Sequence, residues 1–437
     1  MQTGTNLDSS YPPAHAARTR RILVALYLLV AFGDVASKAL ATNKTINRVL
    51  TRHVSGRLAV RIDSAQHPVG NFEIFRAASR HLIIGQNLYA SYAGELQDRF
   101  KYSPTFAFIF TPLALLPWPL ALFLWHAVNA LLLFVGLEKL LPTRAAHVAL
   151  ACLLPEVLRS MQNAQSNALV AALIIFAFLA LERERAWRAA AVAVLGAFVK
   201  IFPLAAFAFA IPRRQTKPIG IAGVLISLLL ITAPLMVTTP EVLRAQYRWW
   251  GETELIDSHQ RWYSVMELAH RWLGVDWPNW PIQLLGAFVL LAPILLRRDR
   301  WTDERFRLGL LCSVLLYVTL FNHQAERSSY LIGFVGATIW FVLGPASGTR
   351  ISVRRALYGV AMLTIPLMST LLPIPDALRS PTAMLYRLTL PTLAIWIMLQ
   401  RDLLRVSSVR HVPFWRARRN GSTEDPGAVV DRAPIAM

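Results

Sequence analysis

The sequence predicts an all-α, polytopic membrane protein built as a bundle of about 11–13 membrane helices. The chain has 437 residues, of which 55% are hydrophobic and only 16% are charged, whereas a soluble domain carries roughly a quarter charged residues. Several stretches almost free of charge match the ~17–25 residues that cross a bilayer as a helix: 22–40, 218–238, 281–296, 306–321, 328–344 and 384–400. These runs lack the apolar–polar alternation of a membrane β-barrel, which excludes that class.

The basic residues lie in short clusters between the apolar runs. The formal net charge is +20, which in a soluble protein would suggest nucleic acid as a partner. Here the clusters are "RTRR" (18–21), "RR" (213–214), "RRDR" (297–300), "RR" (354–355) and "RARR" (416–419). This is the distribution typical of cytoplasmic loops and ends. We therefore expect membrane lipids, and no nucleic acid, among the partners.

The two ends of the chain are predicted to be cytoplasmic. "RTRR" precedes the run at 22–40 and assigns residues 1–21 to the cytoplasm. The run lacks a small-residue cleavage site, so it is predicted to be a first spanning helix and not a signal peptide. The transmembrane domain then covers 22–401, and 402–437 forms a basic tail that we expect to be disordered. Both cysteines lie within apolar runs, so we expect no disulfide framework or metal cluster.

Two long outer loops are predicted, at 41–103 and 239–280. In the first, Phe72, Phe75, Leu82 and Ile83 follow a helical spacing, and Gly85 marks the end. We expect an amphipathic helix over 71–85 that lies at the membrane surface. The second loop is dense in tryptophan, as expected at a headgroup interface.

The middle of the chain leaves two topologies open. "LERERAWR" (181–188) and "IPRRQTK" (211–217) are both basic, yet a single apolar run joins them. Either the charge rule fails once here, or the run is a hairpin of two half-helices broken near "VKIFP". Pro203 favours the break because it removes a backbone donor.

A polar group interrupts the apolar sequence at 322–326, "NHQAE". His323 and Glu326 are three residues apart and therefore share a helical face. One interpretation is a solvated cap on the following helix; the other is a site that lines a water-filled cavity. Two ligands are too few for zinc, so we expect no metal, and no cofactor is indicated.

Lys200 and a stretch rich in amides are the other unusual polar features. Lys200 lies about a dozen residues from either basic end, which is deep in a bilayer at ~1.5 Å per residue. It then forms a structural ion pair with a neighbouring helix, extends its ammonium towards the membrane surface, or binds an anionic ligand such as a lipid phosphate. In "SMQNAQSNALV" (160–170), Asn163 or Ser166 can cap a helix. Alternatively, its amides recognise hydroxyl groups.

Acidic side chains of the first outer loop are candidates for a catalytic base, although any one of them is more often a solvated charge. The loop carries Asp63, Glu73, Glu95 and Asp98, with Asn71 among them, before "KYSPTFAF" re-enters the membrane.

Five segments resemble, in order, glycosyltransferases of family 87: "NFEIFRAASRHLIIGQNLYASY", "FKYSPTFAFIFTPLALLP", "QSNALVAALIIFAFLALERER", "LGAFVKIFPLAAF" and "FNHQAERSSY". This family groups polyprenol-phosphate-mannose-dependent mannosyltransferases of the GT-C superfamily. The resemblance covers roughly 20–400 and implies a GT-C-like bundle. It also implies an acidic base in the first outer loop, where many members read D-F-x-V-Y. This chain reads "NFEIF", so Asn71 stands where the aspartate usually is.

The resemblance implies a membrane hexosyltransferase of the extracytoplasmic face of the plasma membrane. It would move a sugar, mannose in the first instance, from a polyprenyl phosphate to a lipid or glycan acceptor. Phosphate is a good leaving group, so one base suffices for inverting transfer. The candidate catalytic residues are Glu73, Asp98, His323 and Glu326. The candidate substrate-binding residues are Asn71, Arg76, Lys101, Tyr102, Gln165, Asn167, Lys200, Asn322 and Gln324, of which Lys200, Lys101 and Arg76 are cations for the phosphate.

Two other functions remain open from the residues. A flippase or transporter of lipid-linked glycans also has a basic cavity, but it needs no acidic base beside a loop helix. A non-catalytic membrane scaffold would not need Lys200 within the bilayer. An enzyme is expected to bring Lys200, the helix at 71–75 and residues 323–326 to one outward cavity, whereas a flippase is expected to continue that cavity towards the cytoplasm.

Overall fold

Every regular element in the described part of the chain is helical, which confirms the predicted all-α class. The computed structural model describes residues 11–42, 70–92, 95, 98–274, 276–344, 351–372 and 374–405. The main elements are α1 (Pro13–Thr42), α3 (Asn71–Ile83), α4 (Pro104–Ala114), α5 (Trp118–Leu140), α6 (Thr143–Gln162), α7 (Asn167–Glu182), α8 (Ala186–Val199), η1 (Phe202–Ala210), α9 (Thr216–Thr232), α10 (Pro240–Asp257), α11 (Val265–Leu273), α12 (Asn279–Leu296), α13 (Glu304–Leu320), η4 (Arg327–Ser329), α14 (Tyr330–Val342), α15 (Ile351–Met362), η5 (Leu363–Leu371) and α16 (Pro381–Leu404). Asp63 and the tail beyond residue 405 lie outside these residues.

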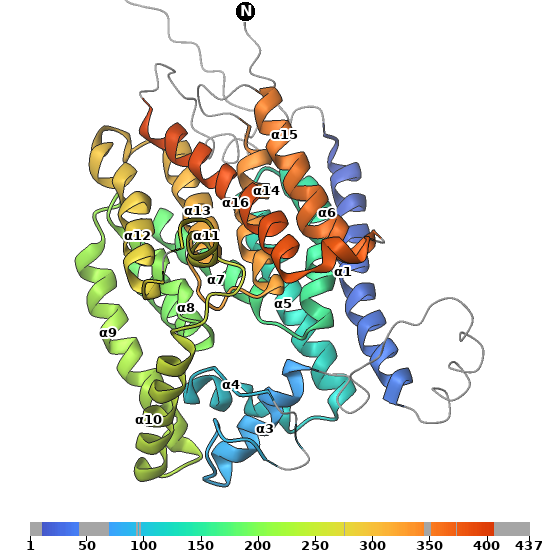
Figure 1. Ribbon diagram of the computed structural model, residues 1–437, viewed down its shortest axis with the longest axis vertical. Coiled ribbons are helices and arrows are strands. Elements are labelled where there is room, and N and C mark those ends of the chain that lie inside the picture. Colours follow the sequence, from blue (N-terminus) through green and yellow to red (C-terminus); the bar gives the residue numbers. More distant parts are fainter. Residues whose placement is uncertain are drawn as a thin grey trace, which may run out of the picture.

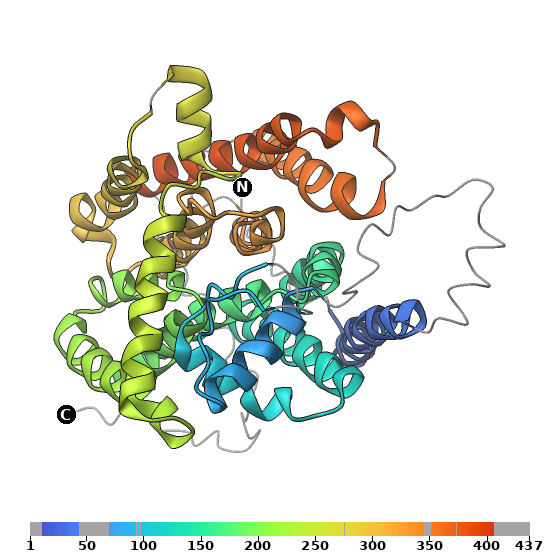
Figure 2. The same cartoon turned by 60° about the horizontal axis from the view of Figure 1, so that its bottom comes forward.

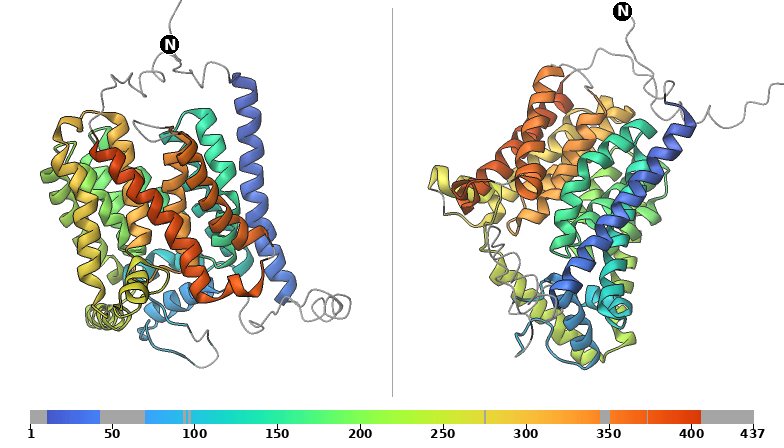
Figure 3. Two further views of the ribbon diagram at one scale, coloured as in Figure 1. Left: turned by 45° about the horizontal axis from the view of Figure 1, so that its top comes forward. Right: turned by 90° about the vertical axis from the view of Figure 1, so that its right-hand side faces the viewer.

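The long helices form one bundle, as Figures 1 and 3 show. Among the described residues, six helices are long and apolar enough to cross a membrane: Pro13–Thr42, Trp118–Leu140, Thr216–Met236, Asn279–Leu296, Ile351–Met368 and Pro381–Leu404. Helices α6, α7, α13 and α14 pack among them, and α14 is apolar and buried along almost its whole length. This arrangement supports the polytopic membrane protein predicted from the sequence.

Charged contacts hold together one end of the bundle. The guanidinium of Arg307, at the start of α13, makes two hydrogen bonds of 2.7 and 2.9 Å to the Glu182 carboxylate at the end of α7. Arg213 donates to the backbone oxygen of Glu182 at 2.9 Å. A buried arginine paired in two places is strongly oriented. The basic loops 181–188, 211–217 and 297–305 therefore meet at the same end of the molecule.

This meeting decides between the two topologies left open for the middle of the chain. Helix α8 runs away from the basic end, breaks at Lys200 in an extended conformation (φ −147°, ψ 138°), and η1 returns. The hairpin alternative is therefore correct, and Lys200 lies at its tip. Gly196 allows the two arms to approach closely, because a Cβ there would lie 2.8 Å from the Pro203 ring.

The opposite end of the bundle carries α3, α4 and α10, as Figure 2 shows from that side. Helix α3 confirms the amphipathic helix predicted over 71–85, and Gly85 at its end has φ +74°. Its apolar face packs on protein instead of on the membrane surface: the ring of Phe75 contacts Phe106 and Phe110 of α4 and Trp125 of α5. Ile83, in contrast, is 43% exposed. The apolar face of α3 is thus covered by protein, and the position of the helix at the membrane surface stays a prediction.

We expect Gly196→Ala to destabilise the protein by about 1–3 kcal/mol, because the added methyl group forces α8 and η1 apart. The matched control is Gly220→Ala in α9, where a Cβ meets no atom within 4 Å and alanine favours the helix. Thermal unfolding in detergent measures both variants. Equal midpoints for the two would contradict close packing of the hairpin.

Candidate active site

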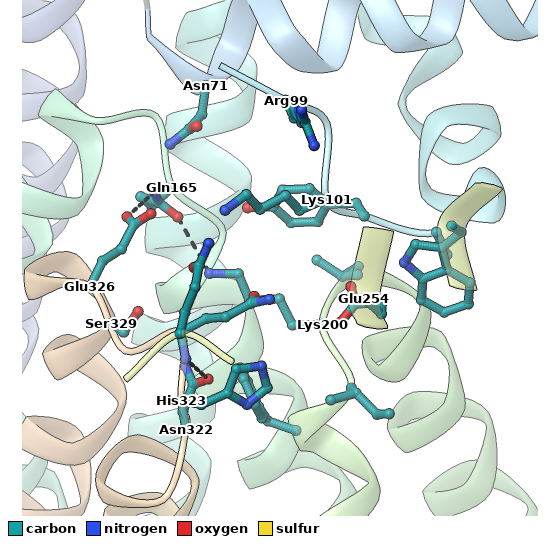
Figure 4. Close-up of a pocket in the computed structure, with 18 of the residues that line it drawn as sticks. Asn71, Arg99, Lys101, Gln165, Lys200, Glu254, Asn322, His323, Glu326 and Ser329 are labelled. Atoms are coloured by element: carbon teal, nitrogen blue, oxygen red, sulfur yellow. Dashed lines mark hydrogen bonds between the residues drawn. The ribbon is translucent and has the colours of Figure 1, made fainter. Parts of the chain in front are cut away.

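A cavity of about 340 Å³ lies at the end of the bundle opposite the basic loops. Figure 4 shows its lining. Six segments contribute: the start of α3, residues 98–103, the loop between α6 and α7 at Gln165, the turn between α8 and η1, residues 250–262 and residues 322–329. Its polar and aromatic lining includes Asn71, Asp98, Arg99, Lys101, Tyr102, Gln165, Lys200, Trp250, Glu254, Gln260, Trp262, Asn322, His323, Gln324, Glu326 and Ser329. Ten of the predicted site residues are in this set.

Lys200 projects into the cavity from the tip of the hairpin. Its Nζ donates to Asn167 Oδ1 at 2.8 Å and to Gln165 Oε1 at 3.4 Å, and it lies 5.9 Å from the centre of the Tyr102 ring. Both acceptors are neutral amides, and the described residues place no carboxylate in a salt bridge with Lys200. Two of its three N–H groups are occupied, so one N–H remains for a ligand. The structural ion pair considered for Lys200 is therefore not present among these residues.

The amide segment before α7 connects Lys200 to the 322–329 segment. Gln165 Nε2 donates to Glu326 Oε2 at 3.2 Å, and Asn167 Nδ2 donates to the Ser328 carbonyl at 2.8 Å. Ser166 precedes α7 but makes no capping hydrogen bond with its side chain. The two amides therefore hold a cation and a carboxylate at a fixed separation, and the capping interpretation is wrong for Ser166.

The polar group at 322–326 turns towards the cavity. Asn322 is buried and accepts from the backbone N–H of Gln324 at 2.9 Å. Gln324 in turn donates to Asp257 at 3.3 Å. His323 Nδ1 accepts from Gln283 at 3.3 Å, which leaves the proton on Nε2. Burial lowers the pKa of His323, so the ring is neutral at neutral pH.

His323 also keeps one donor without a partner. Its Nε2 is buried and makes no hydrogen bond within the described part of the protein. A buried N–H that lacks a partner is costly and calls for water or a ligand. The ring lines the cavity, so a ligand hydroxyl can meet this requirement.

The remaining cations of the cavity differ in their pairing. Lys101 forms an ion pair of 3.0 Å with Asp257, which also accepts from Gln260 and Gln324. Arg99 is exposed at the cavity wall. Asp257 therefore offsets the charge of Lys101 directly, whereas Lys200 makes no salt bridge with any described residue.

Glu254 is an acidic group of the cavity that the sequence analysis missed, as it missed Arg99. It projects from α10 between Trp250 and Asp257. Burial raises the pKa of Glu254 above its ordinary value, with a smaller contribution from Asp257 in the same direction. The sequence signal that could have identified Glu254 is its position within the tryptophan-rich loop.

The candidate bases are separated by the fold. Glu326 and Asp98 both line the cavity, and both are exposed to it. Glu73 lines a second cavity of about 100 Å³ with His81 and Glu95, and Asp98 also borders that space. The structure therefore does not bring Glu73 to the main cavity, because the phase of α3 directs it to the other side.

The first turn of α3 places its two other predicted residues differently. Asn71 lines the cavity, and its Nδ2 donates to the carbonyl of Asn163 at 3.1 Å. Arg76 lies outside the cavity, where its guanidinium donates to the carbonyls of Ala114 and Leu116 between α4 and α5 at 3.4 and 3.3 Å. Arg76 thus anchors α3 and is not among the cavity cations.

The partly buried carboxylate of Glu254 predicts a pH dependence of stability. Because its pKa is raised in the folded protein, its contribution is fully present below the ordinary value of 4.5 and is lost as the pH rises through the folded value. We expect Glu254→Gln to raise the thermal midpoint at pH 7.5 relative to wild type and to flatten the profile above pH ~4.5. Glu252→Gln, at an exposed position of the same helix, is the control. Parallel profiles for Glu254→Gln and wild type would refute this.

Comparison with known proteins identifies the family of the chain. No curated protein matches the chain. The sequence model of glycosyltransferase family 87 matches residues 100–322, about half of the chain. The match includes Lys101, Gln165, Lys200, Glu254 and Asn322, all of which line the cavity. The chain belongs to glycosyltransferase family 87, and it is a membrane glycosyltransferase.

Proposed function

We propose that this protein transfers a hexose, mannose in the first instance, from a polyprenyl phosphate donor to a lipid or glycan acceptor, with inversion at the sugar carbon. One observation carries the proposal: Gln165 bridges Lys200 and Glu326 in a single cavity. A cation for a departing phosphate and a carboxylate for an incoming hydroxyl are the two charges that this reaction requires.

Lys200 holds the donor phosphate. As the bond to the sugar breaks, negative charge grows on the phosphate oxygens, and a cation that is already oriented stabilises it. The two amides keep Lys200 oriented without neutralising it. Arg99 is the second cation that can reach the phosphate, since it is exposed at the same cavity.

Glu326 accepts the proton of the acceptor hydroxyl. Its hydrogen bonds with Gln165 and Ser328 both use Oε2, so Oε1 is left to take the proton. The freed hydroxyl oxygen then attacks the sugar carbon on the face opposite the phosphate. Asp98 is the second candidate because it also lines the cavity. An amide such as Asn71 takes no proton at neutral pH, which supports a base on another segment.

His323 and the tryptophans position the sugar. The free Nε2–H of His323 is a donor for a sugar or acceptor hydroxyl. Trp250 and Trp262 give the cavity apolar faces next to these polar groups. This mixture of apolar walls and a few polar groups is typical of small-molecule sites.

The cavity faces the extracytoplasmic side of the plasma membrane, with both chain ends in the cytoplasm. The support is the charge distribution: the loops 181–188, 211–217 and 297–305 are basic and gather at the end away from the cavity. The lining residues come only from segments at the other end. This one-sided lining supports a transferase over a flippase, for which a path towards the basic end is expected.

The direct experiment is transfer by purified protein supplied with several radiolabelled polyprenyl-phosphate sugars and extracted membrane lipids as acceptors. We expect labelled product from one polyprenyl-phosphate hexose. The anomeric configuration of the product should be opposite to that of the donor. Labelled product with a nucleotide sugar alone, or with retained configuration, would refute the proposal.

Glu326→Gln is expected to lower turnover by roughly 10²–10⁴-fold, because the amide removes the base and leaves the shape of the side chain. Asp98→Asn tests the second candidate in the same assay. Glu73→Gln is the matched control, since Glu73 lies outside the cavity and should change turnover little. If Glu326→Gln keeps normal turnover while Asp98→Asn loses it, the base is Asp98.

Lys200→Met is expected to weaken binding of the polyprenyl-phosphate sugar at least tenfold and to change acceptor binding little. The variant removes the ammonium but keeps an apolar stem of similar length. Donor affinity measured in detergent, without acceptor, provides the test. A variant that binds the donor as tightly as wild type would show that Lys200 does not hold the phosphate.

A further inference from the structure

A second cluster of charges lies on the other side of the 322–329 segment from the cavity. Glu326 turns to Gln165, but the next residue, Arg327, turns to Glu156 of α6, with Nη2 at 3.7 Å from Oε2. Arg327 is 9% exposed and Glu156 is 1% exposed. None of the residues of this cluster lines the main cavity.

Two further arginines lie close to Arg327. Arg159 follows Glu156 by three residues and so shares its helical face, and Arg387 lies in the second turn of α16. Burial lowers the pKa of Arg327 to about 10; Glu156 opposes this shift, and the nearby Arg159 and Arg387 add to it. Arg327 and Arg159 therefore lie near the Glu156 carboxylate, and Arg387 lies near Arg327. Within this group of side chains, three guanidinium groups face one carboxylate, an excess of two positive charges.

The polar atoms of this cluster are largely without partners. Among the described residues, the following atoms are buried and make no hydrogen bond: Glu156 Oε1 and Oε2, Arg159 Nε, Ser160 Oγ, Arg327 Nη1 and Nη2, and Arg387 Nε and Nη1. No salt bridge other than Glu156–Arg327 reaches the three arginines in this part of the chain. So many unpartnered polar atoms at one place indicate a missing group.

The charge balance indicates that the missing group is an anion. Buried charge without compensation is costly, and the cost rises in a membrane. Arginine pairs are the preferred partners of phosphate because they donate in parallel to two oxygens. Water alone would satisfy hydrogen bonds but would leave the two excess charges.

The position of the cluster indicates that the anion is part of a lipid. Arg159 lies one turn before the end of α6 at Gln162, and Arg387 lies about 9 Å from the start of α16 at Pro381, at ~1.5 Å per residue. The end of α6 belongs to the side of the molecule that holds the cavity, since the loop after it carries Gln165. The first turns of α16 lie near the same side, since Thr389 is hydrogen-bonded to Tyr330, which directly follows the cavity residue Ser329. Arginines within a turn or two of helix ends lie near the depth of lipid headgroups.

We propose that Arg159, Arg327 and Arg387, with Glu156, form a second anion site that binds the phosphate of a lipid. This goes beyond the proposed function, because it assigns a lipid site outside the cavity. The lipid is either a polyprenyl phosphate or a phospholipid, and the shared chemistry is a phosphate on an apolar chain. Arg327 and Glu326 are consecutive, so a lipid bound here would place its headgroup beside the reaction cavity.

Native mass spectrometry and titration of delipidated protein test the site with three probes: polyprenyl phosphate, phosphatidylglycerol and inorganic phosphate. The test variant is Arg159→Gln/Arg387→Gln, which spares the ion pair of Arg327 with Glu156. Arg159→Lys/Arg387→Lys keeps the charge. Arg244→Gln, at an exposed position of α10, removes one charge elsewhere on the same end. Lys200→Met distinguishes lipid binding at this site from lipid binding in the cavity.

We expect wild type to bind a lipid phosphate that Lys200→Met retains and that the double glutamine variant binds at least tenfold more weakly. The double lysine variant should bind this lipid within a few-fold of the wild-type affinity. Arg244→Gln should bind it as tightly as wild type. The lipid that Lys200→Met retains identifies whether the bound phosphate belongs to a polyprenyl phosphate or to a phospholipid. Binding of inorganic phosphate alone, equal lipid binding by wild type and the double glutamine variant, or no lipid retained in Lys200→Met would overturn the inference. If Lys200→Met loses no bound donor, the phosphate role of Lys200 fails while this inference stands.

Discussion

The cavity end of this protein is organised around a lysine that forms no salt bridge with any carboxylate of the described residues. Lys200 reaches the cavity from a helix break, and neutral amide oxygens of Gln165 and Asn167 hold it. An ammonium in this setting stays charged only if polar groups or an anion replace its water. The same amides extend to Glu326 and Ser328. The requirement of one cation therefore positions the carboxylate opposite it.

This arrangement depends on a clamp at the far end of the bundle. The α8–η1 hairpin enters the bundle and returns to the same end. The position of Lys200 at its tip therefore depends on how firmly the base of the hairpin is held. At that base, Arg307 donates two hydrogen bonds to the Glu182 carboxylate, and Arg213 donates one to the Glu182 backbone oxygen. Gly196 then lets the two arms pack closely enough to form a rigid unit. The α8–η1 hairpin is thus held in place at the basic end and positions Lys200 at the other end.

The charges of the cavity are arranged so that opposite signs are adjacent but not all neutralised. Lys101 is offset by Asp257, whereas Lys200 is only solvated by amides. In our proposal this difference directs the donor phosphate to Lys200. Asn71, the polar side chain of α3 at this cavity, donates to a backbone carbonyl and takes no proton. In our proposal the base is therefore a carboxylate on another segment of the same cavity, Glu326.

The sequence by itself determined the helical membrane class and marked Lys200, Gln165 and residues 322–326. These signals are local: a polar group between apolar runs is conspicuous because its burial is costly. The tertiary structure alone decided which charged side chains of the loops line the cavity. Glu73 and Arg76 turn away because burial of Phe75 sets the phase of α3. Glu254 and Arg99 enter the cavity through contacts between segments distant in sequence. No local pattern distinguishes a charge in water from a charge in a cavity, since only long-range packing separates them.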